Sequence, residues 1–126
     1  MAIEIMNAKI TNVSLTMRDH GVLTFYLTLE GGGWGCNVGG YVIGKGFLGA
    51  EEFTGSAKGI EAMMRIMDIV GVDRWEDLNG KYVRAEVEGW GGTIHKIGNI
   101  IKDKWFDMKV FFSEGESEKQ ESRDSK

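Results

Sequence analysis

Two stretches near the start of the chain alternate apolar and polar side chains, the period-2 pattern of half-buried strands. The first covers residues 8–17, with Ile10 out of register, which indicates a β-bulge. The second covers residues 22–30, and Gly21 precedes it at a point where a tight turn needs a positive φ. The pattern predicts a β-hairpin.

A second hairpin is predicted in the later half of the chain. Residues 81–90 alternate apolar and charged side chains, a pair of glycines follows, and residues 93–101 return with a bulge expected near Gly98. Between the two hairpins, residues 34–43 are expected to form a third strand that glycines interrupt. Residues 103–112 carry apolar side chains that would let them dock as a short irregular helix.

One segment has the spacing of an amphipathic helix. Ser56 can cap its N-terminus, Val70 ends the apolar pattern and Gly71 can terminate it. The apolar side chains at i, i+3, i+4 and i+7, expected to face the sheet, are Ile60, Met63, Met64 and Met67. The opposite face pairs Glu61 with Arg65 at i, i+4.

These elements predict one α+β domain over residues 1–112, with a mostly antiparallel sheet of about five strands and one main helix packed on it. The five strands are two hairpins and the glycine-rich strand. Residues 113–126 are acidic and without apolar side chains, so a disordered tail is expected. The pattern leaves open whether the first five residues extend an edge strand, and whether Met1 or Met6 is the native start.

The composition narrows the function classes. The chain has 126 residues, a net charge of −4, one cysteine and two histidines. This content excludes an internal disulfide, leaves few zinc ligands, and disfavours binding along a DNA or RNA polymer. No apolar run approaches the roughly 20 residues of a membrane helix, and no signal peptide is recognisable. A cytoplasmic protein without cofactor or metal is expected.

No catalytic constellation stands out. Cys36 could meet His20 or His95, but a cysteine among strand glycines is more often buried filler. The 19 glycines include no phosphate-loop motif, so a generic anion-binding nest is weaker than a bulged strand as an interpretation of the glycine-rich segment. We therefore expect a binding protein rather than an enzyme.

Aromatic and basic side chains give the better candidates for ligand binding. Tryptophan faces can stack on a base, and arginine or lysine can meet a phosphate. Arg65 has the alternative role of a helix ion pair, and Asn99 can either satisfy a bulge or present a donor and an acceptor to a ligand. The candidate ligand-binding residues are Trp34, Arg65, Arg84, Trp90, Asn99 and Lys104.

Three segments carry a resemblance to a known family. They are NAKITNVSLTMRDHGVLTFYLTLEGGGWGCNVGGY, MMRIMDIVGVDRWEDLNGKYVRAEVEG and KIGNIIKDKWF, which together span most of residues 7–106. The chain resembles the first-described Thoeris anti-defence family, phage proteins that capture the cyclic ADP-ribose signal made by bacterial TIR enzymes.

The resemblance implies a non-enzymatic sponge that holds a small cyclic nucleotide at sites shared between subunits of a homo-oligomer, with extra sites for cyclic oligonucleotides in some relatives. The family combines an aromatic stack, an asparagine and arginines, and the compatible positions here are Trp90, Asn99 and Arg65. A downstream arginine has no clear counterpart, since lysines occupy that region, and lysine lacks a bidentate fork. The alternative is a protein-binding inhibitor of a host defence complex, an anti-CRISPR-type acidic mimic.

Overall fold

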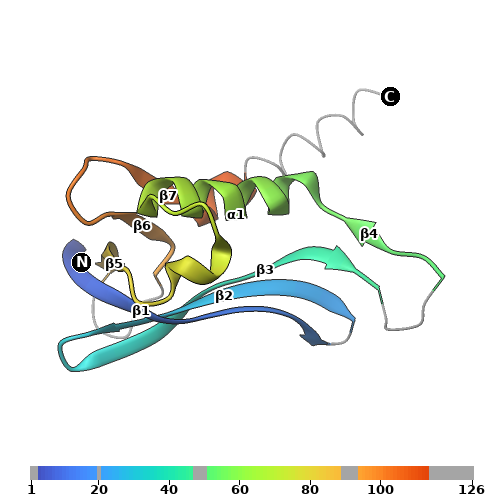
Figure 1. The fold of residues 1–126 in the computed structure, drawn as a ribbon, viewed down its shortest axis with the longest axis horizontal. Helices are drawn as coiled ribbons and strands as arrows, with labels where there is room; N and C mark the ends of the chain where they lie inside the picture. Colours follow the sequence, from blue (N-terminus) through green and yellow to red (C-terminus); the bar gives the residue numbers. More distant parts are fainter. Residues whose placement is uncertain (1–2, 20, 47–50, 89–93, 114–126) are drawn as a thin grey trace.

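A computed structural model describes residues 3–19, 21–46, 51–88 and 94–113 of the chain. One sheet has the strand order β4-β3-β2-β1-β5-β6-β7, with every pairing antiparallel, and α1 lies across it (Figure 1). The elements are β1 (Ile3–Asp19), β2 (Val22–Gly31), β3 (Trp34–Lys45), β4 (Thr54–Gly55), α1 (Ala57–Val70), η1 (Trp75–Leu78), β5 (Tyr82–Glu88), β6 (Lys96–Asn99) and β7 (Trp105–Asp107).

The α+β class and the mostly antiparallel sheet are confirmed, but the sheet has seven strands where about five were expected. Both predicted hairpins are present, as β1–β2 and β5–β6, and β3 is the glycine-rich strand. The two additional strands, β4 and β7, contain only two and three residues. Such short segments cannot display a period-2 pattern, which explains why the sequence did not reveal them.

Helix α1 begins and ends where the sequence predicts. The Ser56 side chain accepts a hydrogen bond from the Gly59 N–H at 3.0 Å, and Gly71 closes the helix in the left-handed conformation with φ 92°. The predicted face is only partly buried, because Met63 and Met67 pack against the core whereas Ile60 and Met64 are exposed. The buried positions of the helix are Gly59, Ala62, Ile66 and Ile69.

Small residues explain this rotation of the helix. A Cβ at Gly59 would overlap the side chain of Ile43 in β3, so the missing side chain lets α1 approach the sheet closely. Ala62, one turn later, is completely buried. A stripe with two small residues looks weakly hydrophobic in the sequence but allows close packing, and this explains why the methionine-rich stripe lies at the edge of the buried face rather than at its centre.

The two predicted bulges have opposite outcomes. The β1–β2 register shifts between Ile10 and Asn12, which confirms the first. The β5–β6 register is regular through Gly98, so the second prediction was wrong. Gly98 instead lies beneath the Trp105 ring, and this ring occupies the space where a Cβ on residue 98 would lie.

The segment expected as a short irregular helix divides into two parts. Its first part is strand β7, which pairs with β6, and a helical turn follows over residues 108–113. This turn returns aromatic side chains to the body of the protein, where Phe112 stacks on Tyr41 with ring centroids 4.3 Å apart. Residues 114–126 of the predicted tail lie outside the described residues.

Candidate functional site

The structure separates the six candidate residues into groups. Arg65 lies on α1, and Asn99 and Lys104 contact Ile69 and Asp68 near the end of the same helix, although 39 positions of the sequence separate Arg65 from Lys104. Arg84 lies on the opposite face of the sheet, and Trp34 begins strand β3. Trp90 lies outside the described residues. The first group is the best-defined candidate site, and we call it the α1 flank.

The α1 flank is built on a stripe of charged side chains next to the buried stripe of the helix. Positions 58, 61, 65 and 68 follow a helical spacing of i, i+3, i+7 and i+10 and alternate basic and acidic residues. With Lys104 from the β6–β7 connection, the flank holds three cations, and it holds two carboxylates. The members of the flank are Lys58, Glu61, Arg65, Asp68, Asn99, Lys104 and Phe111.

Arg65 is held at this flank by contacts that a ligand could replace. Its Nε donates to the Glu61 carboxylate at 2.7 Å, and its guanidinium carbon lies 5.5 Å from the centre of the Phe111 ring. The side chains of Arg65 and Glu61 are 56% and 47% exposed, and ion pairs at such exposure contribute at most about 1 kcal/mol. Lys58 Nζ lies 4.3 Å from the same ring. Two cations and an aromatic ring therefore meet at one place on the surface.

Asn99 anchors the connection between β6 and β7. Its side-chain amide donates to the Ile69 carbonyl at 2.7 Å, and its side-chain oxygen accepts from the N–H groups of Ile101 and Lys102 at 2.9 and 2.8 Å. These contacts join the connection to the last turn of α1. Of the alternatives that the sequence left open, Asn99 fills a structural role, but at a turn rather than a bulge, and one amide hydrogen remains for a ligand.

Lys104 lies beside the same end of the helix. Its Nζ is 3.2 Å from the Asp68 carboxylate and 3.5 Å from the Asp68 carbonyl oxygen. The carbonyls at the end of a helix carry partial negative charge, so the lysine is well placed to stabilise that terminus. The Asp68 side chain is 72% exposed, which leaves this ion pair open to competition from a phosphate.

Arg84 is positioned in a different way. Its Nε donates to the Asn99 carbonyl and one terminal nitrogen donates to the Lys102 carbonyl, both at 2.7 Å. Its guanidinium carbon lies 4.7 Å from the centre of the Trp105 ring. Because Arg84 pairs with Gly98 while Asn99 pairs with Val83, the side chains of Arg84 and Asn99 leave opposite faces of the sheet. Arg84 therefore does not join Arg65 in one site of a single chain.

Trp34 is a packing residue in the β2–β3 hairpin. Its ring occupies the space where Gly31 has no side chain, and it contacts the hydrophobic core. Its indole N–H is buried without a protein partner among the described residues. The geometry leaves little of the ring available for stacking on a ligand.

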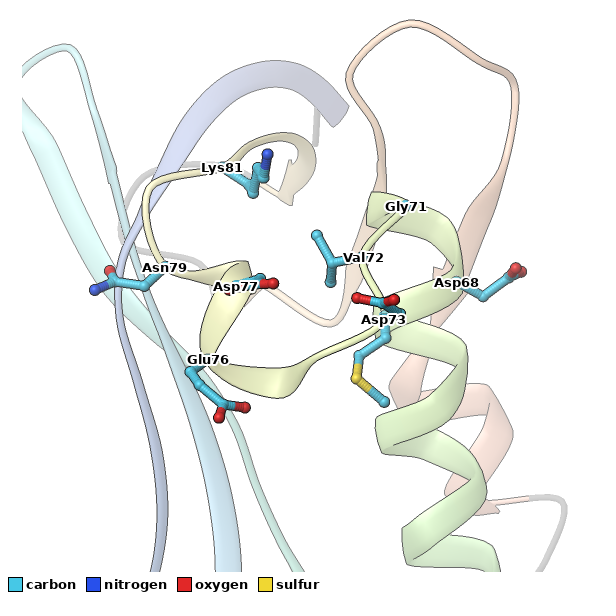
Figure 2. Close-up of a pocket in the computed structure, with 9 residues that line it drawn as sticks. Asp68, Gly71, Val72, Asp73, Glu76, Asp77, Asn79 and Lys81 are labelled. Atoms are coloured by element: carbon cyan, nitrogen blue, oxygen red, sulfur yellow. The ribbon is translucent and has the colours of Figure 1, made fainter.

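An acidic groove at the C-terminal end of α1 was not predicted from the sequence. It has a volume of about 790 Å³ and lies between the end of α1, η1 and the start of β5. Figure 2 shows Val72 pointing into it near Asp73 and Asp77, with Lys81 on another wall and Asp68 turned outward. The segment DRWED, which supplies most of its carboxylates, was the signal that could have indicated it.

Among the described residues, the cysteine and the histidine considered as a catalytic pair lie far apart in the sheet. Burial raises the pKa of the Cys36 thiol, so its nucleophilic thiolate is disfavoured at neutral pH. Strands β2, β1 and β5 separate Cys36 in β3 from His95, which directly precedes β6, and His20 lies outside the described residues. Within residues 3–19, 21–46, 51–88 and 94–113, no three histidine, cysteine or acidic side chains are grouped for a metal ion. No helix of this part is long and apolar enough to cross a membrane.

Comparisons of the chain with protein-family models, with curated proteins and with solved structures give no match.

Proposed function

We propose that the protein is a non-catalytic binder that captures a small cyclic nucleotide signal, such as a cyclic ADP-ribose isomer, and holds it intact. In a phage-infected cell such a protein would act in the host cytoplasm as an anti-defence sponge. The observation that carries the proposal is the α1 flank, where Arg65 and Lys104 lie on one surface with Lys58, Phe111 and the anchored Asn99.

The chemistry of the flank suits a compact anion. Arg65 and Lys58 meet at Phe111, Lys104 lies at Asp68 farther along α1, and the two ion pairs that now occupy Arg65 and Lys104 are exposed and weak. Asn99 presents its remaining amide hydrogen next to the end of α1. Sequestration needs only affinity, since a nanomolar site contributes about 12 kcal/mol and lowers the concentration of free signal.

We also propose a homo-oligomer with ligand sites shared between subunits. Asn99 pairs with Val83, whereas Trp90 follows Glu88, the last described residue of β5. Five residues of strand separate Val83 from Glu88, a distance of about 16 Å. In this proposal, the Trp90 ring that stacks on a base held near Asn99 comes from a second copy.

The test is a thermal-shift screen of the full chain against cyclic ADP-ribose isomers and cyclic di- and trinucleotides. A ligand at one hundred times its Kd adds about 2.7 kcal/mol, which is several degrees in a domain of this size. The complex is then heated and the released ligand is analysed. Intact ligand supports a sponge, cleaved ligand replaces it with an enzyme, and the absence of any shift contradicts nucleotide binding.

Two arginine variants assign the site. Arg65→Ala should weaken nucleotide binding at least tenfold, because it removes a cation from the flank. Arg74→Ala is the matched control, since Arg74 is also exposed and paired with a carboxylate, Glu76 at 3.2 Å, but lies outside the α1 flank, directly before η1. Equal affinity in the two variants would remove the α1 flank from the proposal.

The acidic groove favours a second candidate, a protein-binding inhibitor. Carboxylates of Asp73, Glu76 and Asp77 line it, and the carbonyls at the end of α1 add partial negative charge. A basic surface of a host protein would fit such a groove, and its binding would weaken with salt. Capture of a macromolecule that Asp73→Asn and Asp77→Asn together abolish, without any bound small molecule, would favour this function over the sponge.

A further inference from the structure

The first part of β1 has an unpaired edge. Residues 3–9 pair with β5, but the pairing of β1 with β2 begins only at Lys9 opposite Glu30. Among the described residues, no strand lies against the other edge of residues 3–7. An extended edge of this kind is a template for another strand.

The direction of the backbone groups on this edge follows from Ile10. The Ile10 N–H donates to the Lys81 carbonyl at 2.8 Å, and the Ile10 carbonyl accepts from the Gly80 N–H at 2.7 Å, both on the β5 side. Backbone groups alternate between the two edges along a strand, and the β1–β5 register is regular over residues 3–9. The N–H and C=O groups of Ile3, Ile5 and Asn7 therefore point to the unpaired edge.

Two of these three positions carry exposed apolar side chains. Ile3 and Ile5 are each 57% exposed, and both lie on the face of the sheet that is opposite α1. Tyr82, 56% exposed, lies on the same face of the neighbouring strand, opposite Lys9. Natural edge strands carry charges, prolines or bulges that block association. Residues 3–9 pair without a bulge, the chain has no proline, and the only charges in this segment are Glu4 and Lys9.

We propose that a second copy of this chain pairs with this edge, with β1 antiparallel to the β1 of its partner about a twofold axis at Ile5. In this arrangement Ile5 lies opposite Ile5 of the second copy, and Ile3 lies opposite its Asn7. Each of these pairs exchanges two N–H···O bonds, and the two sheets become one continuous sheet. The pairing buries Ile3 and Ile5 of both chains at its centre.

Charge and space select this register. Opposed residues of antiparallel strands must lie on the same face, so the axis must pass through a residue. An axis at Glu4 would oppose two glutamates, which is unfavourable. An axis at Met6 would bring Ile3 of the second copy opposite Lys9, at the edge position that Glu30 of β2 already occupies. The axis at Ile5 opposes Glu4 to Met6 and keeps residues 3–7 of the second copy clear of the position that Glu30 occupies.

This inference deepens the homo-oligomer of the proposed function by naming the surface that joins two copies, but it rests on the β1 edge alone. Nucleotide affinity and molecular mass are measured separately, so either proposal can fail without the other. A pairing of five residues is small compared with the roughly 1,200 Å² of a stable interface, so the dimer should dissociate on dilution.

The experiment is sedimentation equilibrium of the full chain over a range of concentrations. The mass should rise above the 14.0 kDa of one chain as concentration increases. Ile5→Lys should hold the mass at one chain at every concentration, because it places two ammonium groups face to face on the axis. Ile5→Pro should do the same by removing the outward N–H without removing a bond to β5.

Ile101→Lys is the matched control, since Ile101 is 86% exposed on the β6–β7 connection and lies away from the β1 edge. It should associate like the original chain, and circular dichroism should show that all three variants are folded. Amide hydrogen exchange tests the register of the pairing between the two β1 strands. The N–H groups of Ile3 and Asn7 should be protected only in concentrated samples. A one-chain mass at every concentration, or association that both Ile5 variants retain, would overturn the proposal.

Discussion

Two arginines of this protein lie against aromatic rings, and their other contacts make them different in kind. Arg84, 4.7 Å from Trp105, gives its hydrogen bonds to two backbone carbonyls, one at the end of β6 and one in the β6–β7 connection. Arg65, 5.5 Å from Phe111, gives its bond to the exposed carboxylate of Glu61. Backbone carbonyls cannot move away without distorting the chain, whereas a surface glutamate can. The comparison separates an arginine that maintains the fold from one that is available to a ligand.

The largest expected effect is that of Arg84→Ala. The variant removes two charge-assisted hydrogen bonds and the contact with Trp105, so the free energy of unfolding should fall by about 2 kcal/mol. Urea denaturation measures it. Arg74→Ala, which loses only exposed ion pairs, is the control and should lose less than about 0.5 kcal/mol. Equal losses would remove the structural role of Arg84.

Asn99→Ala should have an intermediate effect. The variant leaves the Ile69 carbonyl and the N–H groups of Ile101 and Lys102 without their partner, but the two N–H groups lie on exposed residues where water can replace it. The expected loss is about 1 kcal/mol of unfolding free energy. Asn99→Asp separates the two halves of this role, because it keeps the acceptor for the turn and loses the donor to α1. A loss confined to Asn99→Ala would assign the stability to the turn.

Arg65→Ala should hardly change stability, by about 0.3 kcal/mol, since its ion pair is exposed and at helix spacing. Its effect should appear in nucleotide affinity, at least tenfold as argued above, and calorimetric titration measures it. The contrast with Arg84 is then complete, because one variant weakens the fold and the other weakens binding. A variant of Arg65 that destabilised the protein as much as Arg84→Ala would break the contrast.

The sequence predicted those parts of the fold whose signals are local. The β1–β2 hairpin, the Ser56 cap and the Gly71 terminus each depend on residues within a few positions, and each is confirmed. The buried face of α1 was predicted only in part, because it depends on the small Gly59 and Ala62 fitting against Ile43 and the core, which no helical periodicity reveals. Strands β4 and β7 exist only through their neighbours in the sheet.

The candidate site was predictable in its residue types but not in its assembly. Asn99 reaches the Ile69 carbonyl across 30 positions, and Lys104 reaches Asp68 across 36. Such contacts require the β6–β7 connection to lie beside the end of α1, which is a tertiary fact. The face of the sheet on which the Arg84 side chain lies was easier to predict. Alternation along the strand places Arg84 on the same face as Glu86, and Val83 and Ala85 on the other face.

A third arginine gives the smallest effect and a reference for the other two. Arg74 and the N–H of Glu76 itself hold the carboxylate of Glu76, and the backbone hydrogen bond followed by the arginine lowers the pKa of Glu76 below its usual value of 4.5. A lowered pKa in the folded state adds stability that is present above the unfolded pKa and is lost as pH falls through the folded one.

Glu76→Gln should therefore lose slightly less thermal stability than the original chain between neutral pH and about pH 3, because the glutamine has no carboxylate to protonate. Matched thermal melts of the variant and the original chain over this range measure the difference. Arg84 is held by backbone carbonyls that do not titrate, so its contribution to stability should stay constant over the same pH range. A pH-dependent effect of Arg84→Ala would show that these carbonyls are not what distinguishes Arg84 from the exposed arginines.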